Sequence, residues 1–215
     1  MTETIILQGN YEKALEKAAS IITSGGLVVV PTDTVYGIIG DATNAGTIAR
    51  LYTLKARQLE KAFPIFVRDV TMARWFAYIS DAKARFLDNA WPSALTVIFH
   101  HKEKLPGILT SKQDTIALRM PQSPFVLALL SRVNIPLVQT SANLSDMPPA
   151  KSAAEVIASF AAEKQKPDLV IDGGDIAGMS STIINLTGKQ PRLVRSGVMT
   201  KEDIDMFFQN ISNIN

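Results

Sequence analysis

The order of apolar segments along the chain constrains the fold more than any other feature. Short runs rich in Val, Ile and Leu, typical of buried strands, alternate with longer segments whose apolar residues recur at helical spacing. The strand-like runs are 27–30, 63–67, 94–99, 115–120, 136–140, 168–172, 181–186 and 192–195, and the helical segments are 10–26, 44–57, 71–91, 123–133, 152–164 and 201–211. This order predicts an α/β domain whose twisted sheet mixes parallel and antiparallel strands and is flanked by helices.

Helix boundaries are marked by the residue types that commonly end helices. Asn10 and Asn44 stand where an N-cap side chain accepts a hydrogen bond from the first turn. Gly25 and Gly26 are the last residues of the first helical segment and favour the end of the helix there.

Composition narrows the class of protein. The 215 residues, 47% of them hydrophobic, suit one compact domain with a sizeable core, and no repeat or linker divides residues 1–215. No apolar run is long enough to span a bilayer and no secretory pattern opens the chain, which predicts a cytoplasmic protein without membrane contact. Cysteine is absent, which excludes disulfides, zinc knuckles and a thiol nucleophile. The net charge of +2 is too small to predict nucleic-acid binding.

The segment 31–37 reads PTDTVYG and directly follows a strand-like run. Its proline, aspartate and glycine are typical of a turn. In an extended segment the hydroxyls of Thr32, Thr34 and Tyr36 would instead share one face and form the floor of a ligand site. Both interpretations stay open on this stretch alone.

Cations gather where the second helical segment ends. Lys55, Arg57 and Lys61 lie within a few residues of one another. Basic residues are common in the last turn of a helix, where they complement its dipole. However, Lys55 and Arg57 are too close in sequence to share a helix face, so a short exit segment that binds a polyphosphate is the other interpretation.

The strand-like run 115–120 separates two kinds of face. Thr115, Ala117 and Arg119 share one face. The other face, which should be core, is formed by Ile116, Leu118 and Met120. Two small residues beside an arginine leave room for a ligand, and the guanidinium fork suits a carboxylate. An ordinary exposed strand face is the alternative.

Further polar residues follow the later strands. Ser141 and Asn143 come just after the strand-like run 136–140 and would point the same way, at the kind of strand end where α/β folds commonly bind ligands. A Ser or Asx turn is the alternative. Ser181 and Arg195 add a hydroxyl and a cation near the end of the chain. The histidines are adjacent, at 100 and 101, so a metal site built on them is not expected.

Taken in order, seven motifs resemble the YrdC-type L-threonylcarbamoyladenylate (threonylcarbamoyl-AMP) synthases. They are PTDTVYG, K-x-R at 55–57, WPSALT, ALRMP, SAN-x-S, SST and RLVRSG. The resemblance runs from about residue 10 to residue 197 and implies the YrdC/RibB-like fold, followed by a C-terminal helix at about 200–211.

The resemblance also implies roles for particular residues. The ATP-binding positions correspond to Lys55, Arg57, Lys61, Thr115, Asn143 and Arg195. The threonine-binding positions correspond to Thr34, Phe66, Arg119, Ser141 and Ser181. The family usually has a histidine where this chain has Phe66, which affects the shape of the threonine pocket. No catalytic nucleophile is implied: Lys55 and Arg57 would act by positioning ATP and neutralising its charge.

The implied reaction joins L-threonine, bicarbonate and ATP with Mg²⁺ into threonylcarbamoyl-AMP and pyrophosphate, the first step of threonylcarbamoyl-adenosine formation in tRNAs. The implied partner is the downstream tRNA threonylcarbamoyl transferase complex. A paralogue of the same fold that binds tRNA or double-stranded RNA in ribosome maturation, without synthase activity, is the alternative function. A carbamoyl-transfer domain of hydrogenase maturation is disfavoured, because such chains carry zinc fingers and this chain has no cysteine.

Overall fold

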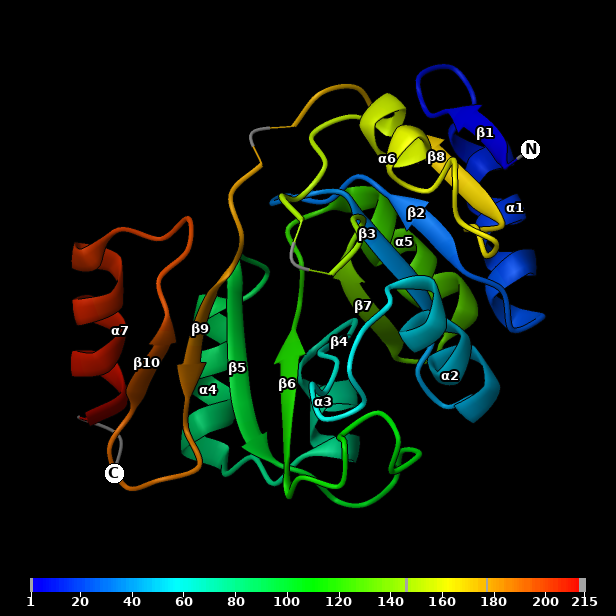
Figure 1. Cartoon of the computed structure of the whole chain (residues 1–215). Helices are drawn as coiled ribbons and strands as arrows, with labels where there is room; N and C mark the ends of the chain where they lie inside the picture. Colours follow the sequence, from blue (N-terminus) through cyan, green and yellow to red (C-terminus); the bar gives the residue numbers. More distant parts are fainter. Residues whose placement is uncertain (1, 146, 177, 213–215) are drawn as a thin grey trace.

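The computed structural model describes residues 2–145, 147–176 and 178–212, which form ten strands and seven helices (Figure 1). The strands are β1 (Glu3–Ile6), β2 (Val28–Val30), β3 (Gly37–Asp41), β4 (Ile65–Phe66), β5 (Leu95–His100), β6 (Thr115–Arg119), β7 (Leu137–Ser141), β8 (Leu169–Asp172), β9 (Thr182–Asn185) and β10 (Arg192–Arg195). The helices are α1 (Tyr11–Thr23), α2 (Ala45–Leu54), α3 (Val70–Phe76), α4 (Asp81–Ala90), α5 (Pro124–Val133), α6 (Ala153–Ser159) and α7 (Lys201–Ser212).

All the strands belong to one mixed sheet in the order β1-β8-β2-β3-β7-β4-β6-β5-β9-β10. The pairs β1–β8, β8–β2, β4–β6 and β5–β9 are parallel, and the remaining neighbours are antiparallel. The mixed α/β sheet expected from the order of apolar segments is therefore confirmed.

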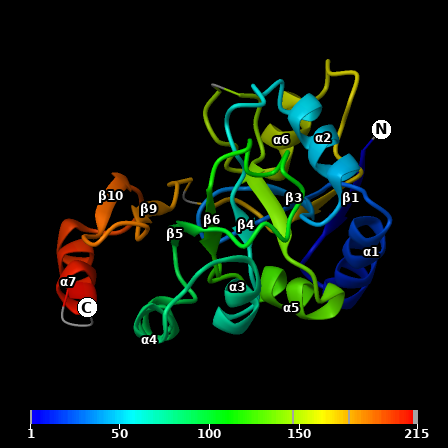
Figure 2. The ribbon, with the colours of Figure 1, turned by 90° about the horizontal axis from the view of Figure 1, so that it is seen from below.

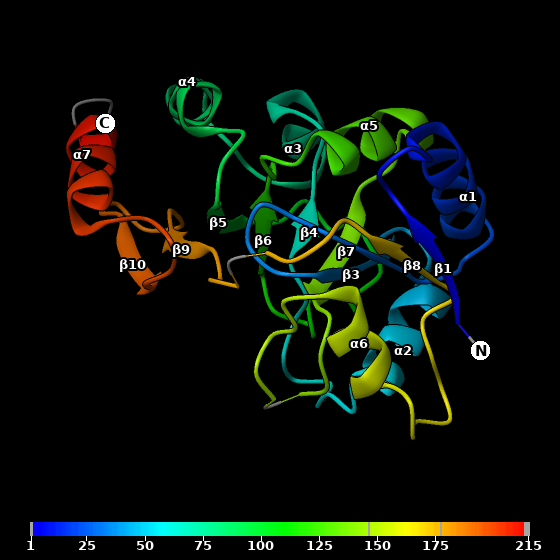
Figure 3. The same cartoon turned by 90° about the horizontal axis from the view of Figure 1, so that it is seen from above.

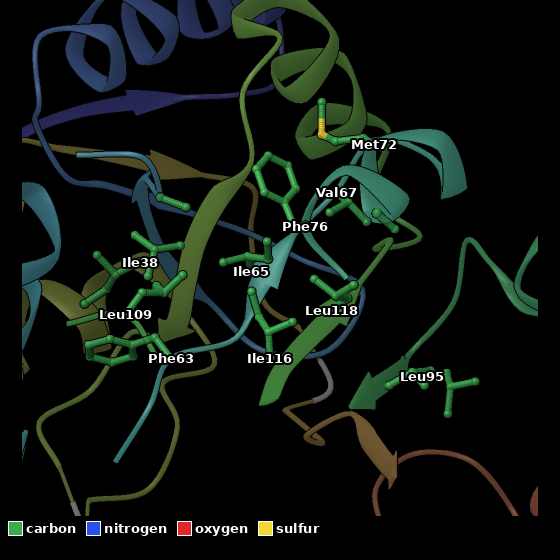
Figure 4. Packing of buried hydrophobic residues seen from close by; sticks show 14 of the residues in the cluster. Ile38, Phe63, Ile65, Val67, Met72, Phe76, Leu95, Leu109, Ile116 and Leu118 are labelled. Carbon is green, nitrogen blue, oxygen red and sulfur yellow. The ribbon is translucent and has the colours of Figure 1, made fainter. Parts of the chain in front are cut away.

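Helices flank the sheet on both sides. In the view from above, α1, α3, α4 and α5 lie on one side of the sheet, and α2 and α6 lie on the other (Figure 3). Helix α7 lies at the far end, beside β10 and away from the N-terminus (Figure 2), and its Phe207 ring meets the Phe86 ring of α4 edge to face. The larger of two apolar clusters includes Ile65 and Leu118 of the neighbouring strands β4 and β6 (Figure 4).

Cap residues set several helix starts. The Asn44 side chain accepts hydrogen bonds from the first turn of α2, as expected, and Ser80, Ser123 and Ser152 cap α4, α5 and α6 in the same way. The expectation for Asn10 is wrong. Its amide donates instead to the carbonyl oxygen of Ile6, and it makes no side-chain cap bond to α1.

Two strands have no counterpart among the strand-like runs. β3 lies between β2 and β7 and is antiparallel to both. It contains Gly40, where an added Cβ would lie only 2.6 Å from the Thr47 side chain and 2.9 Å from that of Leu27. A glycine usually weakens a strand, but here α2 packs too closely for a side chain. β1 is short and mostly exposed, so it lacks the apolar pattern of a core strand.

Candidate functional site

A cavity of about 360 Å³ lies where the strands β5, β6, β7, β9 and β10 meet the loops after β2 and α2. This volume is within the range of small-molecule sites. Its lining comprises Thr34, Val35, Arg57, Ala62, Phe63, Pro64, Thr96, Ile98, Gln113, Thr115, Ile116, Ala117, Arg119, Gln139, Thr140, Ser141, Ser180, Ser181, Ile183, Val194 and Arg195. The sequence-predicted residues in this set are Thr34, Arg57, Thr115, Arg119, Ser141, Ser181 and Arg195.

The PTDTVYG segment forms a turn and also contributes to the cavity wall. The Thr32 hydroxyl accepts hydrogen bonds from the backbone N–H groups of Thr34 and Val35, so it closes a turn. The buried Tyr36 hydroxyl donates to the carbonyl oxygen of Gly174, and burial raises its pKa. The Thr32 and Thr34 hydroxyls lie 3.0 Å apart, whereas the Tyr36 hydroxyl bonds to a different segment at Gly174. Of the three, only that of Thr34 is on a cavity-lining residue.

Arg119 is held from several sides and is 2% exposed. Its Nη2 lies 2.7 Å from Asp33 Oδ2, its Nη1 donates to Thr34 Oγ1 at 3.1 Å, and its Nε donates to the carbonyl oxygen of Ser93 at 3.1 Å. Burial lowers the pKa of Arg119, the Asp33 carboxylate opposes that effect, and the positive charge of Arg195 adds to it. A guanidinium stays protonated in proteins. The second N–H groups of Nη1 and Nη2 are not used by these contacts, so a ligand carboxylate can accept from them.

Arg57 and Lys61 are four residues apart and in contact, but only Arg57 lines the cavity. The Arg57 guanidinium lines the cavity, lies 4.8 Å from the centre of the Phe63 ring, and donates to the carbonyl oxygens of Lys61 and Ala62. Lys61 is exposed and is not among the cavity residues. Its backbone therefore supports Arg57, while its ammonium would need to swing inward to meet a ligand there.

Lys55 does not line the cavity, contrary to the expectation that its ammonium faces a triphosphate. The side chain is 2% exposed. Its Nζ donates to the carbonyl oxygen of Ser141 at 2.8 Å, to Asn143 Oδ1 at 3.1 Å and to the carbonyl oxygen of Asn143. Burial, and to a lesser degree the charge of Arg57, lowers the pKa of Lys55 to about 7.

The expectation that Ser141 and Asn143 point the same way is wrong. Ser141 ends β7 and lines the cavity, whereas Asn143 is buried and is not among the lining residues. The chain leaves the extended conformation after Ser141, and the Asn143 amide donates to the carbonyl oxygens of Leu144 and Met147. Asn143 thus organises the turn, which was the alternative interpretation of this segment.

The late motifs SST and RLVRSG form one joined unit. The Ser181 hydroxyl lies 2.9 Å from Thr96 Oγ1. Arg195 donates from Nε and Nη2 to the carbonyl oxygen of Ser181, at 3.2 and 2.9 Å. A Cβ at Gly197 would lie 2.3 Å from the Ser181 carbonyl carbon, so no other residue permits this contact without a backbone shift. The C-terminal strand therefore sets the position of the cavity serine.

Phe66 is the remaining predicted residue that does not line the cavity. It is 1% exposed and belongs to the smaller apolar cluster, between the sheet and helices α1 and α5. The Arg119 guanidinium carbon lies 5.7 Å from the centre of its ring. Phe66 therefore borders the site through Arg119, because its strand neighbour in β6 is that arginine.

Several cavity residues were not predicted. Gln139 shares a face of β7 with Ser141, and Thr96 shares a face of β5 with Ile98, so the alternation rule that identified Thr115 would have found them. Asp33 was assigned only to the turn. Its role as the carboxylate partner of Arg119 depends on a contact between distant segments, which no local pattern reveals.

Neither a membrane-spanning helix nor a metal cluster is found in the described ranges. No helix there is long and apolar enough to cross a bilayer. No group of three or more His, Cys, Asp or Glu side chains in those ranges could hold a metal ion. Neither histidine is itself a cavity-lining residue: His100 Nδ1 is 3.1 Å from Asp114 Oδ2, and His101 contacts the carbonyl oxygen of the lining residue Gln113.

Three guanidinium groups and several hydroxyls therefore surround one cavity in a mixed α/β sheet. Cations and hydroxyls around a cavity of this size suit a small anionic ligand. Residues 20–197 match the family model Sua5_yciO_yrdC, described as "Telomere recombination". The chain belongs to this Sua5/YciO/YrdC family, which confirms the resemblance found in its motifs.

The sequence is similar to those of proteins from several organisms. The chain is 34% identical over 211 residues to a "Putative threonylcarbamoyl-AMP synthase" of Mycobacterium tuberculosis, covering 95% of this chain and 94% of the relative. It is 33% identical over 190 residues to the "Threonylcarbamoyl-AMP synthase" of Pyrococcus abyssi, covering 87% of this chain and 55% of that protein. The chain thus spans about half the length of the Pyrococcus abyssi and Bacillus subtilis relatives.

Solved structures share the fold. The crystal structure of P. abyssi Sua5 complexed with L-threonine has a TM-score of 0.86 at 31% identity, over 93% of this chain and 58% of that one. The crystal structure of E. coli YciO has a TM-score of 0.79 at 27% identity, over 88% of this chain and 91% of that one.

Proposed function

We propose that the protein is an L-threonylcarbamoyladenylate synthase, which makes threonylcarbamoyl-AMP and pyrophosphate from L-threonine, bicarbonate and ATP. The observation that carries the proposal is the grouping of Arg57, Arg119 and Arg195 around one cavity with the hydroxyl residues Thr34, Thr115, Ser141 and Ser181. Family membership and the L-threonine complex of the P. abyssi relative support it. The product would serve threonylcarbamoyl-adenosine formation in tRNAs, with a tRNA threonylcarbamoyl transferase complex as the downstream partner.

Two substrates divide the cavity in this proposal. The threonine carboxylate accepts from the free N–H groups of Arg119, beside Thr34 and Ser181. Arg57 and Arg195 offset the charge of the triphosphate, and Thr115 lies in the same lining. Ser141 orients the reacting groups from the end of β7.

The chemistry needs positioning more than a protein nucleophile. The threonine nitrogen attacks carbon dioxide, formed from bicarbonate by loss of hydroxide, and gives a carbamate as the nitrogen loses a proton. A carbamate oxygen then bonds to the α-phosphorus, and the bond to the β-phosphate oxygen breaks to release pyrophosphate. Charge spreads over phosphate oxygens in such a step, and fixed cations stabilise it.

ATP would bind as its Mg²⁺ complex. The residues that the structure describes hold no cluster of metal-ligating side chains, so we assign the ion no protein ligands. Phosphate oxygens and water commonly complete the coordination of Mg²⁺ in nucleotide sites. We therefore treat Mg²⁺ as part of the substrate.

The test is a product assay. The purified protein is incubated with ATP, Mg²⁺, bicarbonate and labelled L-threonine, and threonylcarbamoyl-AMP and pyrophosphate are measured. We expect pyrophosphate release only when threonine and bicarbonate are both present. Equal pyrophosphate release from ATP alone would mean that the protein only hydrolyses the nucleotide. Absence of product together with tight binding of tRNA or double-stranded RNA would favour the RNA-binding paralogue.

A further inference from the structure

The ammonium of Lys55 makes a complete set of hydrogen bonds inside the protein. An ammonium carries three N–H donors and no acceptor. Three oxygens accept from Lys55 Nζ: the carbonyl oxygens of Ser141 and Asn143, and the side-chain Oδ1 of Asn143. No N–H group is left over for a phosphate oxygen, so a contact to ATP would have to break one of these bonds.

All three acceptors lie on one short segment. Further bonds join this segment to its surroundings: the Ser145 N–H donates to the Lys55 carbonyl oxygen at 3.1 Å, and the Ala142 N–H donates to that of Tyr36 at 2.7 Å. Lys55 therefore holds the segment 141–145 through both its side chain and its backbone. The held segment begins at Ser141, which lines the cavity.

The chemistry of the partners explains why a lysine stands here. None of the three acceptors is a carboxylate, and removal of an ammonium from water is unfavourable without compensation. Only a long side chain with several donors at one point can satisfy three oxygens that converge after the end of β7. A neutral residue of the same length would leave those oxygens buried and without a donor.

We propose that Lys55 is a positioning residue that fixes the segment 141–145, and with it Ser141, at the wall of the cavity, and that it does not contact ATP. This inference rests on the proposed function for the identity of the nucleotide. It assigns direct contact with the triphosphate to Arg57, the neighbour that lines the cavity.

The test compares ATP with AMP, which lacks the β- and γ-phosphates. Calorimetric affinities are measured for the wild type, Lys55→Met and the control Arg57→Ala. We expect Arg57→Ala to weaken ATP binding ten- to a hundredfold and AMP binding at most threefold. Lys55→Met should weaken the binding of ATP and of AMP by factors that agree within about threefold. The reason is that the substitution displaces the cavity wall and removes no phosphate contact. The proposal would be overturned if Lys55→Met lost affinity for ATP but not for AMP, or if its affinity for both nucleotides were unchanged.

A second measurement covers the case in which Lys55→Met does not fold. The wild type is treated with an ATP derivative that carries an acyl phosphate, which acylates lysines beside the bound triphosphate, and the modified residues are located by mass spectrometry. Excess ATP serves as the competition control, which shows that the probe occupies the nucleotide site. We expect Lys55 to stay unmodified when the probe is bound in the absence of that competitor. Acylation of Lys55 would show direct phosphate contact and refute the positioning role.

The two proposals can fail separately. If the wild type binds neither nucleotide, the proposed function fails. The support of segment 141–145 is then judged from the unfolding free energies of Lys55→Met, Asn143→Ala and the double variant. A double variant no less stable than Lys55→Met supports a joint unit, and strictly additive losses contradict it.

Discussion

Lys55 and Arg119 are both cations with 2% of their surface exposed, yet their surroundings differ in kind. Arg119 meets a carboxylate, Asp33, at 2.7 Å and lines the cavity. Lys55 meets only neutral oxygens and lies behind the cavity wall. The fork of Arg119 keeps donors in reserve, whereas the ammonium of Lys55 uses all of its donors.

The comparison shows that burial alone does not identify a ligand-binding cation. What separates the two regions is the set of partners and whether any donor remains for a ligand. In the Arg119 region, Asp33 balances the charge, so the arginine can face a cavity without a ligand present. In the Lys55 region, the protein itself occupies the place that a ligand would take.

Loss of the charged partner should have the largest effect on stability in the Arg119 region. Arg119→Ala leaves the Asp33 carboxylate without its cation; one Asp33 oxygen is already buried without a partner. We expect a loss of about 3–5 kcal/mol in the free energy of unfolding, measured by urea denaturation. The double variant Asp33→Asn/Arg119→Ala should recover part of it. A loss below about 1 kcal/mol would mean that the pair is not buried in solution.

A conservative change in the same place should separate ligand binding from stability. Arg119→Lys keeps the charge beside Asp33 but loses the two-pronged geometry. We expect the affinity for L-threonine to fall by about ten- to a hundredfold, or roughly 1.5–3 kcal/mol, with ATP affinity nearly unchanged. Calorimetric titration with each ligand measures this. Normal threonine binding with lower thermal stability would make Arg119 a structural residue like Lys55.

The exit segment after α2 offers a matched pair of cations. Arg57→Ala removes a cavity contact and should weaken ATP binding by about tenfold or more. Lys61→Ala removes an exposed cation that is not in the lining, and exposed charges contribute about 0–1 kcal/mol, so a change of at most about fivefold is expected. An equal loss in both variants would show that Lys61 swings into the cavity.

The pH dependence of stability should report the buried ammonium of Lys55. Its pKa is about 7 in the folded protein, against an ordinary value of 10.5. Between these values the unfolded chain binds more protons than the folded one, so the contribution of Lys55 to stability increases as the pH rises. The wild type should gain stability relative to Lys55→Met by up to about 1.4 kcal/mol per pH unit between about pH 7.5 and 9.5. A flat difference would place the folded pKa near its ordinary value.

The sequence contained much of this account, but only where local pattern decides the structure. Alternation along β6 placed Thr115 and Arg119 on one face and left its role open, and both residues line the cavity. β3 was missed because glycine disfavours strands, and the reason for Gly40, its close approach to the side chain of Thr47, is a tertiary contact. Motif resemblance identified Lys55 as important but did not show where its side chain points. That direction depends on a segment 86 residues away in sequence.

One measurement compares the two cations without any substitution. In ¹⁵N-labelled wild type, the side-chain signals of the Arg119 guanidinium and the Lys55 ammonium are followed while L-threonine and then ATP are added. The account predicts that threonine shifts the Arg119 signal strongly, because its free N–H groups gain a carboxylate, and that the Lys55 signal keeps its position with both ligands. A Lys55 signal that moves with ATP while Arg119 does not respond to threonine would contradict the account.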